Sequence, residues 1–91
     1  MPDDTAVLTR AWRVSPQVSL RPEPFGALAY HFGTRRLSFL KSRTLLEVVQ
    51  CLDEHPTAAD ACHAAGVEKP DLPAYEQALA TLAGTGMISA R

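Results

Sequence analysis

This sequence of 91 residues lacks most of the features that would mark an enzyme or a membrane protein. It contains no glycine-rich phosphate loop, no nucleophile elbow and no HExxH motif, and its three histidines are scattered. No apolar run approaches the ~20 residues that cross a membrane. The N-terminal MPDDTAVLTR lacks the basic and apolar regions of a secretion signal. We therefore expect a cytoplasmic protein that is not an enzyme and uses no cofactor.

Cysteine is scarce as well, since Cys51 and Cys62 are the only two. A cytosolic chain with two cysteines gives little reason to expect a disulfide. Together with two nearby histidines they spell C-x3-H-x6-C-H, which is not a common zinc-site spacing. Cys62 also falls on the apolar stripe of an expected helix, with Ala58, Ala61 and Ala65. We expect Cys62 in the core and no metal site.

Neither sign of charge is in large excess, because the net charge is −1. Such a balance predicts no general attraction to nucleic acid or to an anionic membrane. The two halves differ, however. Residues 1–45 hold seven Lys/Arg and three Asp/Glu, whereas residues 46–91 hold two and seven, which gives +4 and −5. The folded protein should have a basic side and an acidic side.

Residues 12–40 show the period-two alternation of half-buried strands. In QVSLRP, Val18 and Leu20 alternate with polar residues, and flanking prolines cannot donate ladder hydrogen bonds. ALAYHF follows a Pro-Phe-Gly turn and forms the second strand. Gly33-Thr34 should supply a tight reversal, with glycine at positive φ, into the third strand RRLSFL. The short connections favour a three-stranded antiparallel meander.

The third strand ends the expected sheet and contains no proline or glycine to protect it. Leu37 and Phe39 share one of its faces, and Arg36, Ser38 and Leu40 share the other. Ordinary core packing is the simplest role for Leu37 and Phe39. An unprotected edge of this kind invites another chain to pair with it.

Three helices should follow the strands. Ser42 or Thr44 can cap the first, which ends before His55-Pro56. Thr57 can cap the second, AADACHAA, and Gly66 can end it. The third helix carries an apolar stripe at spacings of three and four residues, formed by Tyr75, Ala78, Leu79 and Leu82. Met87-Ile88 could add a last extended segment, whereas residues 1–11 show no periodicity and are expected to form a disordered tail.

The order of elements predicts an α+β fold over residues 12–91, a winged-helix-like module in which a three-stranded meander precedes three helices. Winged-helix modules often bind DNA, but the third helix here has no Lys or Arg with which to contact phosphates. A DNA-binding module therefore remains as an alternative only. A homodimer paired through the open strand edge is a second alternative.

The span from about Trp12 to Met87 resembles the PqqD-like peptide chaperones, also called precursor-peptide recognition elements. The resemblance rests on WRVSPQVSLRPEPFGALAYHFGTRRLSFLKSRTLLEVVQ, above all on its central LRPEPFGALAYHFGTRRLSFLK, and covers about four fifths of the chain. Within that family the sequence is similar to the chaperones of mycofactocin maturation. It departs from the family pattern in the acidic, proline-containing linker before the third helix, which leaves open how that helix lies over the third strand.

The resemblance implies a role without catalytic residues. In that role the leader of a ribosomally synthesised precursor peptide adds to the third strand, in a cleft against the third helix. The resemblance also implies delivery of the peptide to a radical S-adenosylmethionine (radical SAM) maturase. It does not suggest nucleic acid or a membrane as a partner. The expected peptide-binding residues are Arg35, Arg36, Leu37, Ser38, Phe39, Leu40, Lys41, Tyr75, Ala78, Leu79 and Leu82, and nearby Arg43 extends the basic cluster that would guide an acidic leader.

Overall fold

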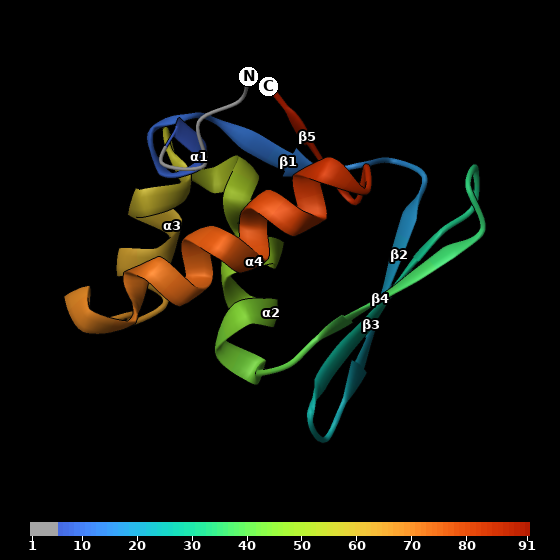
Figure 1. The fold of residues 1–91 in the computed structure, drawn as a ribbon, viewed down its shortest axis with the longest axis horizontal. Coiled ribbons are helices and arrows are strands. Elements are labelled where there is room, and N and C mark those ends of the chain that lie inside the picture. Colours follow the sequence, from blue (N-terminus) through green and yellow to red (C-terminus); the bar gives the residue numbers. More distant parts are fainter. Residues whose placement is uncertain (1–5) are drawn as a thin grey trace.

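The computed structural model describes residues 6–91 and has a mixed α+β architecture, as expected (Figure 1). Helices gather on one side of a small sheet, and the two hairpin ends of that sheet project beyond them. The elements in chain order are α1 (Ala6–Thr9), β1 (Trp12–Val14), β2 (Val18–Glu23), β3 (Gly26–His31), β4 (Arg36–Leu40), α2 (Arg43–Gln50), the 3-10 turn η1 (Leu52–Glu54), α3 (Ala58–Ala64), the 3-10 turn η2 (Lys69–Asp71), α4 (Leu72–Gly84) and β5 (Ile88–Ala90).

The expected meander is confirmed as an antiparallel sheet of order β2-β3-β4. The structure adds a separate two-stranded sheet, in which Trp12 of β1 pairs with Ala90 of β5. The extended segment expected at Met87-Ile88 is confirmed from Ile88 onward, and its partner is β1. Pairing of β1 with β5 ties the two ends of the described chain together beside α4 (Figure 1).

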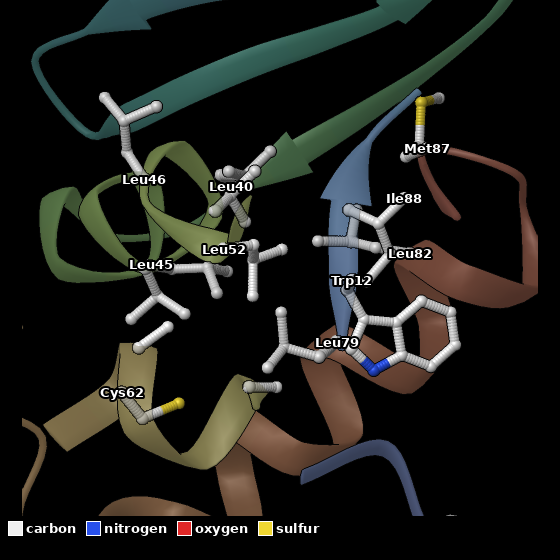
Figure 2. Packing of buried hydrophobic residues seen from close by; sticks show 14 of the residues in the cluster. Trp12, Leu40, Leu45, Leu46, Leu52, Cys62, Leu79, Leu82, Met87 and Ile88 are labelled. Atoms are coloured by element: carbon white, nitrogen blue, oxygen red, sulfur yellow. The ribbon is translucent and has the colours of Figure 1, made fainter. Parts of the chain in front are cut away.

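The inner face of the three-stranded sheet is built from small side chains. Ala27 and Ala29 of β3 are completely or almost completely buried, and Leu40 of β4 is fully buried opposite Ala27. Alanines at these positions let α2 pack closely on β3. The larger Leu40 reaches the core from the end of β4 (Figure 2).

The expectation that Leu37 and Phe39 pack in the core is wrong. Their side chains are 59% and 61% exposed. The register places Leu37 opposite Tyr30 and Phe39 opposite Leu28, all on the outer face. Apolar side chains occur on both faces of β4, so alternation alone could not tell which face the helices cover.

The helix boundaries follow the expected capping residues. Ser42 Oγ accepts the Leu45 amide at 3.0 Å at the start of α2, and Thr57 Oγ1 accepts the Asp60 amide at 3.2 Å at the start of α3. Helix α3 ends at Ala64, and Gly66 follows its C-cap Ala65 as expected, with a φ of 88° that glycine adopts more readily than other residues.

The core lies between the helices and the two sheets (Figure 2). Trp12 is buried there and donates its indole N–H to the Val7 carbonyl at 2.8 Å. Residues 1–5 of the expected tail lie outside the described residues. The rest of it differs from the expectation, because Ala6–Thr9 form α1 and Val7 is buried. A single helical turn is too short to show periodicity, and a tertiary contact with Trp12 holds it in place.

The β3–β4 turn also differs from the sequence-based prediction. Arg35, rather than Gly33, takes the left-handed conformation, with φ of 59°. His31 stabilises the turn, because its Nδ1 accepts the Gly33 and Thr34 amides at 3.0 and 3.1 Å. The Gly33 and Thr34 amides thereby gain a hydrogen-bond partner within the protein. Their bonds to His31 hold the start of β4 in register with β3.

Gly26 fixes the junction between β3, β4 and α2. It is buried with φ of 151°, and a Cβ there would overlap the Leu40 carbonyl oxygen and lie 2.8 Å from the Ser42 nitrogen. Those neighbours are backbone atoms, so they cannot rotate away. Only glycine fits the position.

We predict that Gly26→Ala lowers the free energy of unfolding by at least about 2 kcal/mol. The substitution would combine backbone strain at positive φ with steric overlap between the new Cβ and the Leu40 carbonyl oxygen. Gly84→Ala is the matched control, since a Cβ at this helical residue meets nothing within 4 Å. The control should change stability by less than about 1 kcal/mol, towards greater stability. Urea denaturation measures both. Equal effects of the two substitutions would contradict the account of Gly26.

Candidate functional site

Strands β2 and β4 are both edges of the three-stranded sheet, but they differ in protection. Pro22 lies within β2, where it is opposite Ala27. Proline has no amide to offer a pairing strand. Strand β4 contains neither proline nor glycine and is followed directly by Lys41. The unprotected edge of this sheet is therefore β4.

The direction of the β4 backbone groups follows from two hydrogen bonds. The Phe32 amide donates to the Gln17 carbonyl at 2.8 Å, so the backbone hydrogen-bonding groups of Phe32 point towards β2. The Arg35 amide donates to the His31 carbonyl at 2.7 Å, so the backbone hydrogen-bonding groups of His31 point towards β4. The backbone N–H and C=O groups of successive residues in a strand point to opposite sides of that strand. Ala29 therefore bonds towards its register partner Ser38.

The same alternation turns the backbone groups of Leu37 and Phe39 away from β3, towards the open edge. Residues of β4 therefore divide into two sets. Ser38 and Leu40 have backbone groups that bond inward and side chains on the inner face. Leu37 and Phe39 have backbone groups at the open edge and side chains on the outer face.

A groove with a cavity volume of about 730 Å³ runs between β4 and α4. Leu45 of α2 and Leu82 of α4, both buried, form its apolar floor. Residues from the strand side and the helix side line it, namely Ser38, Phe39, Lys41, Leu45, Ala74, Gln77, Ala78, Ala80, Thr81 and Leu82. The small side chains of α4 leave room for the side chains of a ligand.

The structure brings five of the expected residues into this groove: Ser38, Phe39, Lys41, Ala78 and Leu82. The other six lie elsewhere. Leu40 and Leu79 have no exposed surface and belong to the core, and Tyr75 is half-buried against it. Leu37 faces outward, and Arg35 and Arg36 lie at the exposed end of the β3–β4 hairpin.

Sequence reasoning found Ala78 and Leu82 but missed the other α4 residues that line the groove, namely Ala74, Gln77, Ala80 and Thr81. Ala74, Gln77, Ala78 and Thr81 follow one another at intervals of three, one and three residues, which places them on one side of α4. This stripe of small and polar residues shares Ala78 with the apolar stripe that predicts the helix and otherwise lies beside it. Because it lacks large side chains, it gives a weaker periodic signal.

Basic residues flank β4 at both ends, and one of them, Lys41, lines the groove. Arg35, Arg36, Lys41 and Arg43 are all exposed, and none of them makes an ion pair with another described residue. The ion pair that the structure does contain within residues 6–91, Arg21 with Glu23 at 3.0 Å, lies on β2. The four cations are therefore available to an acidic ligand.

The two cysteines offer no reactive thiolate near neutral pH. Burial raises the pKa of the Cys62 thiol to about 11, and burial with nearby Glu54 raises the pKa of Cys51. Cys62 lies in the core, as expected.

Within residues 6–91 no three metal-binding side chains lie close enough to hold an ion. None of the described helices has the length and apolar character needed to cross a membrane.

Comparison with known proteins identifies the family. The model of the Peptide chaperone MftB family matches residues 11–89. The chain belongs to this family. It is 57% identical over 82 residues to Peptide chaperone MftB of Mycobacterium tuberculosis (strain ATCC 25618 / H37Rv), a match that covers 90% of this chain and 75% of the relative.

Two further relatives of the Peptide chaperone MftB family have the same name. The Mycobacterium ulcerans (strain Agy99) protein is 57% identical over 79 residues, which is 87% of this chain and 72% of the relative. The Mycolicibacterium smegmatis (strain ATCC 700084 / mc(2)155) protein is 54% identical over 78 residues, which is 86% and 76%. No solved structure gives a significant match. The winged-helix likeness is therefore not confirmed.

Membership of the MftB family bears out the likeness to PqqD-like chaperones and supports a peptide-chaperone role. Such a role is not catalytic, which agrees with the expectation that the chain is not an enzyme.

Proposed function

We propose that this peptide chaperone binds the leader of a ribosomally synthesised precursor peptide, of the mycofactocin type, and presents it to a radical SAM maturase. The single observation that carries the proposal is the meeting of an unprotected strand edge and an open apolar groove at β4. Family membership supports a peptide as the ligand.

The peptide would add to the sheet as a fourth strand. Main-chain hydrogen bonds to Leu37 and Phe39 would supply affinity that depends little on the peptide's sequence. Alternate side chains of the peptide would then point into the groove, between Ser38 and Ala78, where apolar and small residues fit. Specificity would come from these inward side chains.

The basic residues near the edge would speed association with the leader peptide and would oppose self-association of this chain. Arg35, Arg36 and Lys41 would attract an acidic leader and speed its association. The same cations would discourage two copies from pairing through β4, because like charges would meet. The expected residues Leu40, Leu79 and Tyr75 would act indirectly, by packing beneath the strand and helix that form the groove.

Nucleic acid and membrane are not proposed as partners. Helix α4 has no Lys or Arg, so it lacks the side chains that contact phosphates. The cytoplasmic location expected from the sequence stays a prediction.

We predict that Phe39→Pro weakens binding of precursor leader peptide by at least about ten-fold while the protein stays folded, because the amide that is lost points to the open edge. Phe39→Ala keeps that amide and removes the ring, so it controls for the side chain and should bind more tightly than Phe39→Pro. Ser38→Pro should instead destabilise the fold, since its amide faces Ala29 of β3. Calorimetric titration measures affinity, and circular dichroism measures folding.

The proposal would be contradicted by a folded Phe39→Pro variant that binds as tightly as Phe39→Ala. A well-folded Ser38→Pro variant would contradict the assignment of inward and outward amides.

The chaperone role itself is tested by reconstitution. Radical SAM maturase, reductant, S-adenosylmethionine and subsaturating precursor are combined with and without this chain, and mass spectrometry measures the modified peptide. We expect the chain to increase product formation, because a docked leader raises the effective concentration of the rest of the peptide at the active site. Equal product formation would contradict the chaperone role, and product formed by this chain without maturase would contradict the absence of catalysis.

A further inference from the structure

The outer face of the three-stranded sheet carries a patch of exposed apolar side chains. All four of the strongly exposed large apolar residues in the described chain belong to it: Phe25 (46% exposed), Phe32 (59%), Leu37 (59%) and Phe39 (61%). Half-buried Leu28 and Tyr30 lie between them, because the register places Leu28 opposite Phe39 and Tyr30 opposite Leu37. We call these six residues the outer-face patch.

Two pairs of rings in the outer-face patch pack against each other. The rings of Phe25 and Phe39 are centred 6.1 Å apart, and those of Tyr30 and Phe32 are 5.4 Å apart in an edge-to-face arrangement. Helices of the described chain lie on the other side of the sheet, so they leave this face uncovered (Figure 1). A contiguous exposed apolar patch of this kind marks an interaction surface more often than a structural one.

We propose that the outer-face patch is the surface on which the peptide-modifying enzyme docks. This inference rests on the proposed function, because it takes that enzyme to be the partner that receives the bound peptide. The partner surface should be apolar at its centre and acidic at its rim.

The size of the patch favours a transient partner over a stable dimer of this chain. With ~200 Å² for each fully exposed aromatic side chain, the four most exposed residues present on the order of 400 Å². Two such surfaces together would bury about 800 Å², which is below the roughly 1,200 Å² of stable interfaces and suits a weak encounter. A chaperone that delivers its peptide and leaves needs such an encounter.

Charge also argues against a second copy. Residues 18–41, which form the sheet and its turns, include four basic residues and one acidic residue, Glu23. Glu23 already pairs with Arg21. Two copies facing each other would set two such basic surfaces against each other, whereas an acidic rim on another protein would complement the basic surface.

The location of the patch fits delivery of a peptide. Leu37 and Phe39 belong to both surfaces: their side chains form part of the patch, and their backbone groups form the open edge. A peptide strand on β4 would therefore lie directly beside an enzyme docked on the patch. The groove lies on the α4 side of the β4 edge and shares only Phe39 with the patch, so it would stay free for the inward side chains of the leader.

The test is a double variant, Phe25→Ser with Phe32→Ser, in which neither substitution lies on β4. We expect its affinity for the radical SAM maturase of the mycofactocin system to fall by at least about ten-fold, as loss of central aromatic contacts does. Its affinity for leader peptide should stay within about two-fold of the wild type, because the edge and groove are untouched. Thermal unfolding confirms that the variant is folded.

The matched control is Ala78→Glu, which places a charged side chain in the groove and leaves the outer-face patch intact. It should bind leader peptide weakly and bind maturase, in the absence of peptide, as the wild type does. If Ala78→Glu kept full peptide affinity, the proposed groove would be wrong while the test of the patch would stand.

Unchanged maturase affinity in the double variant would overturn the inference. It would also be overturned if the wild type formed dimers in sedimentation experiments and the double variant were monomeric, because a second copy would then cover the patch.

Discussion

The antiparallel ladder between β3 and β4 is the constraint on which both proposed surfaces depend. Its register and its alternation turn the backbone groups of Leu37 and Phe39 to the open edge and their side chains to the outer face. The same alternation turns the side chains of Ser38 and Leu40 towards the helices. A one-residue slip would exchange all of these roles and would place an aromatic ring in the core.

Three local features hold that ladder in register. Gly26 lets β3 approach the end of β4 closely, and His31 Nδ1 accepts two amides of the turn at the other end of the hairpin. Beside Gly26, Leu40 anchors the end of β4 in the core, because full burial of a leucine contributes about 1.5–3 kcal/mol. Because both ends of the hairpin are fixed, the open edge between them is preorganised, which lowers the entropic cost of adding a strand.

Much of this architecture could be predicted from the sequence, because it is encoded locally. Alternating residues gave the three strands, and Ser42, Thr57 and Gly66 gave the helix limits. The parts that could not be predicted depend on tertiary contacts. The helical turn at Ala6–Thr9 is held by Trp12, and the burial of Ala27 and Ala29 instead of Leu37 and Phe39 is decided by where α2 packs. In the wall of small residues on α4, Ala78 was predicted, but Ala74, Gln77 and Thr81 were missed because periodicity analysis weights large apolar side chains.

The most direct test of the central claim is amide hydrogen exchange, measured residue by residue by NMR with and without leader peptide. In the peptide-free protein the Leu37 and Phe39 amides should exchange rapidly, whereas the Ser38 amide, which faces Ala29, should be protected. Adding saturating leader peptide should slow exchange at Leu37 and Phe39 by at least about ten-fold, because these amides would then pair with the new strand. Peptide binding that leaves the Leu37 and Phe39 amides in rapid exchange would contradict docking on the β4 edge.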